Sequence, residues 1–218
     1  MPTLDWPTDL VPAKATWGLQ SNTETFTSPL NRSVQTVERP GARWKVTLEF
    51  PSMAPAGRRK LEAFLAGLGG MAGRFSLWPH TAPIADIAAA PVDASMVLNF
   101  LTQAYQATLS VVVDGTLSNY KLLPTKYWPA NTLVLKAGEY LAAGNELKMV
   151  TADVVSDANG KATIPVAPAF RNAPANLAVV TLNRPMTTMM LTSDEYAVPV
   201  VPGFISETVV LSAVEVFA

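Results

Sequence analysis

The eight residues RWKVTLEF, Arg43 to Phe50, alternate strictly between apolar and polar side chains. Successive side chains of a β-strand point to opposite faces of its sheet, so one face of this segment is apolar and the other is polar. The apolar set is Trp44, Val46, Leu48 and Phe50. The pattern predicts a half-buried antiparallel strand, with Arg43 and Lys45 together on the face toward water.

The residues before this strand are polar and strand-like. Ser21–Glu24 is a candidate turn, RSVQTVER at 32–39 alternates, and Pro40-Gly41 is a turn dipeptide. We expect residues 21–39 to form an extended hairpin that reaches a neighbouring molecule.

The pattern changes to a helical period directly after the strand. In PAGRRKLEAFLAGL, residues 55–68, apolar side chains recur at helical spacing, and they are Leu61, Phe64, Leu65 and Leu68. Pro55 suits a first helical turn, and Gly69-Gly70 suits a left-handed stop. We therefore predict one helix over 55–68, followed by a strand in GRFSLWP at 73–79.

The rest of the chain predicts a second β-rich block and a return to the first. Residues 81–95 are rich in proline and alanine and hold no period, which is typical of a linker. Short β segments fill 96–185, with turns expected at Ala143–Asn145 and at Asp157–Gly160. The segment 209–216 is apolar on both faces, so we expect it to dock as a strand in the first domain.

The predicted fold is therefore mainly β. A β-sandwich or barrel domain with one helix comprises 1–80 plus 186–218, and a second β-barrel is inserted at 96–185. Two β domains in simple tandem remain the alternative. The expected core of the first domain is Trp17, Trp44, Phe50, Leu61, Phe64, Leu65 and Phe75.

The composition gives few signs of chemistry. Apolar residues make up 49% and charged residues 15% of the 218 residues, which predicts a folded chain with surface covered by partners or a surface rich in Ser, Thr and Asn. The net charge of −1 gives no basic signature for nucleic acid. The start resembles no signal peptide and no run of 18 apolar residues occurs, so we expect no membrane anchor.

Candidate catalytic and metal groups are scarce. The chain has no cysteine and one histidine, His80, which lies between prolines without an acidic neighbour. SDANG at 156–160 lacks the rest of a calcium loop, and Asp194-Glu195 would face opposite ways on a strand. We expect no enzyme activity, no cofactor and no metal.

The basic residues of the first domain suggest a surface instead. Arg43 and Lys45 share one strand face, and Arg58, Arg59 and Lys60 crowd the start of the helix. They are either a solvated face or a positive patch that meets an acidic partner. Arg43 and Lys45 are our candidates for an inter-subunit or lumen surface.

Several phrases resemble the distal tail protein family of long-tailed bacteriophages. They are WPTDLVP at 6–12, TWGLQSN through LEFPSM at 16–53, RRKLEAFLAGLGG at 58–70 and GRFSLWP at 73–79. The segment 137–175, from AGEYLAAGN to FRNAPA, is similar to the β-rich second domain of such tail-tip proteins. No one of these phrases is diagnostic alone.

The resemblance implies a structural virion protein, made in the host cytoplasm and located at the phage tail tip. Such proteins form homohexameric rings that join the tail tube protein to hub or fibre proteins, and DNA passes through the lumen without specific binding. It also implies an oligosaccharide-binding-like second domain and no cofactor.

Two other function classes stay open. A carbohydrate- or receptor-binding module of a tail appendage would need an exposed aromatic platform, for which Tyr127 and Trp128 are the candidates. A β-sandwich hydrolase would need a clustered acid and base pair, which the sequence does not present.

Overall fold

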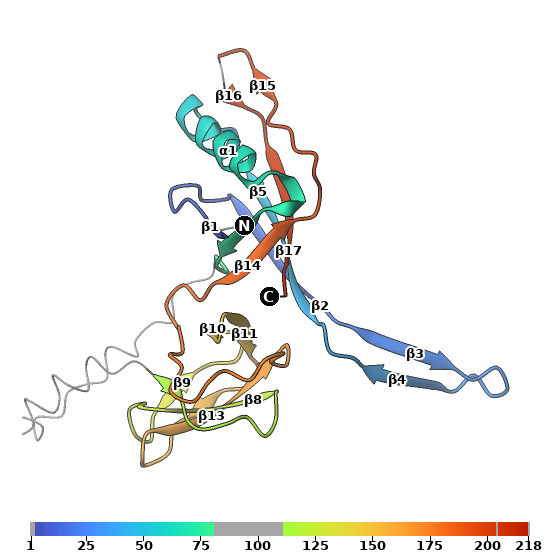
Figure 1. The fold of residues 1–218 in the computed structure, drawn as a ribbon, viewed down its shortest axis with the longest axis vertical. Helices are drawn as coiled ribbons and strands as arrows, with labels where there is room; N and C mark the ends of the chain where they lie inside the picture. The colour runs from blue at the N-terminus through green and yellow to red at the C-terminus, as the bar shows by residue number, and fades with distance from the viewer. Residues whose placement is uncertain (1–2, 81–110, 204, 218) are drawn as a thin grey trace, which may run out of the picture. The chain divides into compact units, whose positions relative to one another are not determined.

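The computed structural model describes residues 3–80, 111–203 and 205–217 (Figure 1). The chain divides into two compact units, of which the first joins Met1–His80 with Thr187–Ala218 and the second is Thr81–Met186. The predicted linker, 81–95, lies outside the described residues. The predicted class is confirmed, since the described chain is mainly β with one α-helix.

The first unit is built on a six-stranded sheet. β1 pairs with β6 in parallel, and the other neighbours are antiparallel. β17 lies between β14 and β5, so the last strand of the chain completes this sheet as predicted. In sheet order the strands are β1 (Thr3–Asp5), β6 (Arg74–Leu77), β14 (Thr187–Leu191), β17 (Val209–Glu215), β5 (Arg43–Phe50) and β2 (Lys14–Gln20).

The opening stretch of sequence is strand β5, with the predicted orientation. Its apolar side chains are all buried, and Lys45 on the other face is exposed. The neighbouring strand β17 continues this buried face, with Leu211 beside Leu48 and Ala213 beside Val46. The outer face of β17 is only partly covered, because Val210 stays exposed although Val214 is buried.

Helix α1 (Pro55–Leu68) covers the buried face of the sheet, so a helix rather than a second sheet forms the facing layer. The helix begins with Pro55 in its first turn and ends at Leu68, and it is capped by Gly69, whose φ of 66° is left-handed. A short 3₁₀ helix, η1 (Gly70–Ala72), follows.

The aromatic core of the first unit differs in part from the predicted one. Trp6 was missed, yet it is buried and contacts Phe50, Phe64 and Phe75 with ring centroids 5.0–5.9 Å apart. Its indole N–H donates to the carbonyl of Leu10 at 2.9 Å, which satisfies its polar atom. Five of the seven predicted core residues are buried, namely Trp44, Phe50, Leu61, Leu65 and Phe75.

The other two predicted core residues, Trp17 and Phe64, are only partly buried. Trp17 faces the core from β2, which forms the outer edge of the sheet and therefore has a neighbouring strand on one side only. Its ring lies against Trp44, with centroids 6.4 Å apart.

Residues 21–39 form the extended hairpin that the sequence predicts. β3 (Thr23–Thr27) pairs with β4 (Val34–Glu38), and this ribbon continues the β2–β5 pair beyond the sheet (Figure 1). Ser21–Glu24 is therefore no reversal, and the prediction of a turn there is wrong. Pro40-Gly41 likewise lies along the ribbon opposite Asn22, and the chain reverses at 28–33.

The second unit is a curled β-sheet closed by a further segment. Its five-stranded sheet has β10 and β7 at its edges, and residues 177–182 hydrogen-bond to both. Val180 N donates to Val111 O, and Thr181 N donates to Ala142 O. In sheet order the strands are β10 (Tyr140–Ala143), β11 (Glu146–Val150), β13 (Lys161–Ala167), β8 (Leu122–Lys126) and β7 (Val112–Val113), with β9 (Leu133–Leu135) and β12 (Val154–Val155) as a separate pair.

Both predicted turns of the second unit are present. Gly144 and Asn145 join β10 to β11 with φ values of 59° and 64°, as a two-residue hairpin turn with both central residues left-handed requires. At Asp157–Gly160 the chain turns between β12 and β13, and the Asp157 carboxylate accepts the N–H groups of Asn159 and Lys161. β12 pairs with β9 rather than with β13, so this turn does not close a hairpin of the two strands beside it.

Candidate assembly interface

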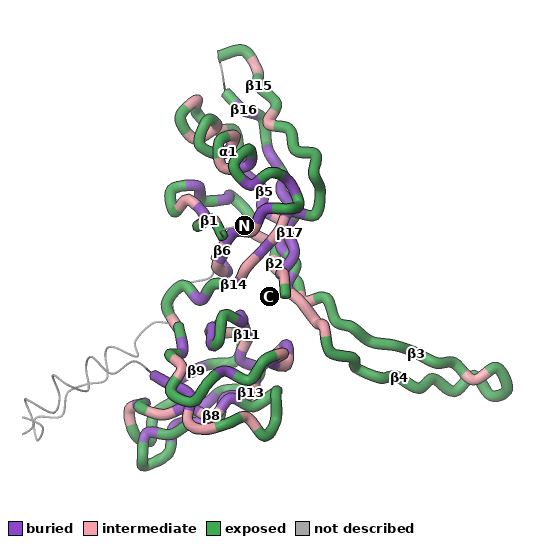
Figure 2. Tube along the Cα trace, viewed as in Figure 1, coloured by how far each residue is buried: buried purple, intermediate pink, exposed green. Residues whose placement is uncertain are grey.

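The hairpin of residues 21–42, which we call the arm, is the most exposed part of the first unit (Figure 2). Every residue of β3 and β4 is exposed. A two-stranded ribbon by itself is marginally stable in water, and its outer edges carry unpaired backbone groups. The arm is therefore a candidate surface for contact with another molecule.

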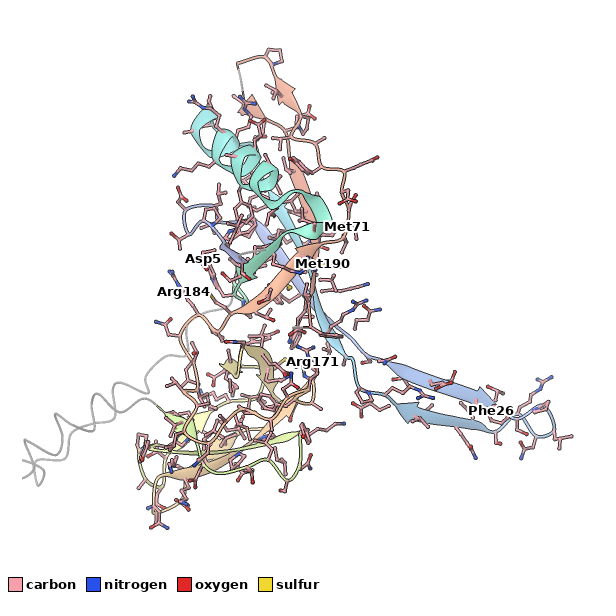
Figure 3. The ribbon with its side chains drawn as sticks, viewed as in Figure 1. Asp5, Phe26, Met71, Arg171, Arg184 and Met190 are labelled. Carbon is pink, nitrogen blue, oxygen red and sulfur yellow. The ribbon has the colours of Figure 1, made fainter. Side chains whose placement is uncertain are left out.

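One face of the arm carries Phe26 and Val37 among Glu24 and Gln35, and the other face is rich in hydroxyl groups. Phe26 pairs with Gln35, and Val37 pairs with Glu24, so Phe26 and Val37 are diagonal neighbours on one face. Their side chains remain 63% and 58% exposed. Figure 3 shows Phe26 far out along the arm, beyond the sheet. The opposite face carries Thr23, Thr25, Thr27, Val34, Thr36 and Glu38.

The base of the arm is held by specific hydrogen bonds. The Asn22 amide donates to the Pro40 carbonyl at 2.7 Å, and Arg39 N donates to the Asn22 carbonyl at 2.7 Å. Gly41 has a φ of 113°, and a Cβ there would lie 3.2 Å from Asn22 Nδ2. The ribbon is further joined across its strands by an ion pair between Arg39 and Glu24.

Arg43 and Lys45 lie at the base of the arm, on the outer face of the sheet as predicted. Arg43 Nε donates to Gln20 Oε1 at 3.3 Å, and Lys45 lies between Gly18 and Val214 in the register. At the other end of β5, on the same face, Lys14 pairs with Glu49 at 3.1 Å. The surface therefore carries both signs of charge among threonine and serine, and a role in an interface or lumen stays a prediction.

The basic cluster at the start of α1 is largely neutralised by local partners. Arg58 pairs with Glu62 at 2.8 Å, and Lys60 pairs with Asp9. Arg59 donates to the Pro55 carbonyl at 3.1 Å. These contacts fit a solvated face better than a positive patch.

A buried carboxylate that the sequence did not single out lies at the end of β17. Glu215 accepts a hydrogen bond from the N–H of Trp44 at 3.1 Å and from the Thr187 hydroxyl at 2.9 Å. It thereby joins β5 and β14 on either side of β17. Its position in an alternating apolar strand was the available signal, because a charge at a core-facing position needs hydrogen-bond partners.

Tyr127 and Trp128 do not form the predicted aromatic platform. Trp128 is buried in the core of the second unit, where its indole N–H donates to Thr125 Oγ1 at 2.8 Å. Tyr127 is exposed, with a left-handed φ of 76°. The backbone turn at Tyr127 sends the two rings to different environments, so the platform prediction is wrong.

The second unit has a shallow depression of about 460 Å³ beside the Gly144-Asn145 turn. Its polar lining includes Asn145, Thr181, Asn183 and Arg184, and its apolar lining includes Val179. Such groups can donate hydrogen bonds to a polar ligand, but the lining holds no aromatic ring.

A buried charge network fixes the loop after β13 in the second unit. Lys148 is fully buried, and its ammonium donates to Glu146 Oε2 at 2.6 Å and lies 4.7 Å from the Phe170 ring centroid. Glu146 also accepts the N–H groups of Arg171, labelled in Figure 3, and Asn172. Burial opposes ionisation of Glu146, but these hydrogen bonds outweigh it and lower its carboxyl pKa.

The described residues present little catalytic geometry. Burial lowers the pKa of His80, whose two ring nitrogens have no hydrogen-bond partner among the described residues. Asp194 accepts the N–H of Met71 at 2.7 Å and so anchors a loop to η1. Within 3–80, 111–203 and 205–217, acidic side chains and histidine form no cluster of three or more that could hold a metal ion, and no helix has the length and apolarity to cross a membrane.

The sequence matches no protein-family model and no curated protein. The resemblance to distal tail proteins therefore rests on the phrases quoted above, and what it implies enters only as a proposal.

Proposed function

We propose that this chain is a structural protein of a phage tail tip, which assembles as a homohexameric ring. The ring joins the tail tube to the hub or baseplate proteins, and DNA passes through its lumen. In this proposal the chain acts by geometry rather than by chemistry, and it needs no cofactor.

The observation that carries the proposal is the arm. It is an exposed ribbon with apolar side chains on its surface, it continues two strands of a core sheet, and its base is hydrogen-bonded. Such a ribbon gains stability when another molecule buries it, and a ring needs an element that reaches from each copy to the next. The low charge content of 15% agrees with a surface that is partly covered in the assembly.

The experiment is the mass of the full chain by light scattering after size exclusion, with negative-stain images of the same fraction. We expect a hexamer with an annular outline. In the matched variant, residues 23–38 are removed and replaced by Asn-Gly. Thr23 and Glu38 are the pair at which the ribbon begins, so the short turn closes the same two strands. This variant should keep the fold and lose the ring. A chain that remains monomeric both alone and on purified tail tubes would contradict the proposal.

The depression beside Gly144-Asn145 supports a second candidate, a carbohydrate- or receptor-binding module. Asn183 and Arg184 are better test positions than Trp128, which is buried. Binding on a glycan array that is lost in Asn183→Ala/Arg184→Ala and kept in Tyr127→Ala would favour this candidate.

A further inference from the structure

The arm joins the sheet through a break in the strand register. The last pair of the sheet is Gln20 with Arg43, and the first pair of the arm is Thr23 with Glu38. Between these two pairs, one strand of the ribbon has two residues and the other has four. Such an excess on one strand is a β-bulge, which bends the ribbon and increases its twist. Figure 1 shows the ribbon changing direction between β5 and β4.

The residues of this bulge leave few of its backbone groups without a partner. Arg39 N donates to the Asn22 carbonyl at 2.7 Å, which continues the register of the arm and leaves Ser21 opposite the remaining excess. Pro40 has no N–H to satisfy, and its carbonyl accepts the Asn22 side-chain amide at 2.7 Å. Gly41 has a φ of 113°, which residues with a side chain rarely adopt. A slack connection would need none of these features, so the bulge has a defined geometry.

The excess is an even number of residues, so the bulge bends the ribbon without exchanging its two faces. Side chains alternate along a strand, and a shift of two residues returns each side chain to the same face. Along the strand without excess residues, Phe26 falls on the same side as Gln20, which is on the outer face of the sheet with Lys45. The bulge therefore changes the direction of the arm and keeps its surfaces in phase with the sheet.

We propose that this bulge, formed by residues 39–42 opposite Ser21 and Asn22, sets and fixes the direction in which the arm leaves the first unit. The direction is a property of one copy, because every bond that defines it lies within the chain. Its use rests on the proposed function, in which the arm reaches from one copy to the next. The position of a contact far along the arm depends on the angle at its base.

Removal of Pro40-Gly41 is the direct test, because it leaves two residues on each strand and so permits an uninterrupted ladder. Pairs of spin labels on cysteines measure the direction, since the chain has no cysteine of its own. One label is placed at Thr36→Cys, which is exposed in β4. The other is placed at Val210→Cys or Val11→Cys, which are 57% and 65% exposed in the first unit. Each labelled chain is diluted in excess unlabelled chain, so that only distances within one copy are measured.

The parent chain should give one narrow distribution for each distance, at low and at high protein concentration. Removal of Pro40-Gly41 should shift at least one of the two distances. Thr36 lies roughly 15 Å beyond the bulge, so a change in bend of about 20° moves it by roughly 5 Å. Two unchanged distances in this variant would overturn the proposal. Broad distributions in the parent, or distributions that change with concentration, would also overturn it, because the arm would then be held by its neighbours.

The matched control removes Leu30-Asn31 from the tip of the arm. It shortens the chain by the same number of residues, lies beyond the Thr36 label and leaves the bulge intact, so both distances should remain those of the parent. The distance from Val210 to Val11 lies outside the arm and should be the same in every variant. It reports that the first unit keeps its fold.

Asn22→Ala tests the bulge without a change in length. The Pro40 carbonyl loses the amide that binds it, so the distributions from Thr36 should broaden about their parent positions. Asn31→Ala is its control, because the Asn31 side chain accepts the N–H of Ser33 at the tip, and its loss should leave the widths unchanged. Equal widths in Asn22→Ala and the parent would overturn the proposal that these bonds fix the arm.

The distances and the mass separate this inference from the ring proposal. Shifted distances with the mass of the parent support the bulge and contradict the role of the arm in the ring. Unchanged distances overturn the bulge and leave a hexameric ring standing. Shifted distances with loss of the ring support both.

Discussion

In each unit, a few buried polar or aromatic residues join neighbouring strands and loops through specific partners. Trp44 lies at the start of β5, 2% exposed, and its backbone N–H is bound by the buried Glu215. In the second unit the Glu146–Lys148 pair ties β11 to the loop at Arg171 and Asn172. Both arrangements place a charge where a substitution would leave a buried partner unsatisfied.

Trp44→Ala should lower the free energy of unfolding of the first unit by about 3–5 kcal/mol, because it removes a large buried ring beside Trp17. Urea unfolding of dilute protein measures this loss. Phe26→Ala is the control, since Phe26 is 63% exposed and its removal should cost less than about 0.5 kcal/mol. A loss below about 1 kcal/mol for Trp44→Ala would contradict its place in the core.

Glu146 should make the second unit sensitive to acid. Its folded pKa lies below the ordinary 4.5, so its stabilising contribution is complete above that value and is lost as the pH falls through the lower folded pKa. Glu146→Gln should cost about 3–5 kcal/mol at pH 7, because the buried Lys148 ammonium loses its counter-charge. Calorimetry from pH 3 to 7 measures both effects.

Glu139→Gln is the control for the acid experiment, because the Glu139 carboxylate accepts a local N–H at the surface, from Lys136. It should leave the pH dependence of the second unit unchanged. If Glu146→Gln unfolds with the same pH dependence as the parent chain, the network does not contribute as described.

At the scale of elements, turns decide how the strands of the second unit meet. The Asp157–Gly160 turn packs against the chain at Trp128, whose backbone N–H donates to the Gly160 carbonyl at 3.0 Å. Gly160 has a φ of 67°, and a Cβ there would lie 2.4 Å from the Trp128 carbonyl oxygen. Gly115, with a φ of 89°, has open space around the same position.

Substituting these two glycines separates the free-energy cost of a left-handed backbone from the cost of a steric collision of Cβ. Gly115→Ala should cost about 1–2 kcal/mol from the left-handed backbone alone. Gly160→Ala should cost at least about 1 kcal/mol more, because Cβ meets a backbone oxygen that cannot rotate away. Chemical denaturation of the two variants measures the gap. Equal losses would show that the turn relaxes without disturbing Trp128.

For the whole molecule, the chain path makes the first unit depend on residues from both ends of the sequence. β17 lies in the middle of the six-stranded sheet, whereas the second unit closes its own barrel with residues 177–182. Removal of 209–218 should therefore unfold the first unit and leave the second folded. Four tryptophans lie in the first unit and Trp128 lies in the second, so indole N–H resonances distinguish the units.

In the truncated chain, the Trp128 resonance should stay dispersed and protected by its bond to Thr125, while the resonances of Trp6, Trp17 and Trp44 collapse to the unfolded position. Loss of the Trp128 resonance as well would show that the second unit needs the first. Retention of all five would contradict the central role of β17.

The sequence by itself determined the elements whose signals are local. The alternation at 43–50 and the period at 55–68 specify backbone geometry within a few residues, and Gly144-Asn145 is one of few pairs that suit its turn. It also indicated that 21–39 is a hairpin and that Arg43 and Lys45 share a face. These features require no knowledge of distant neighbours.

Only the tertiary structure decided what depends on contacts between distant residues. Trp6 rather than Trp17 completes the aromatic core, because β2 is an edge and Trp6 reaches under α1. Trp128 is buried because Thr125 and the barrel core surround it. The exposed pair of Phe26 and Val37 on one face of the arm was recognised only once the register was known, since burial of a side chain depends on which other surfaces can reach it.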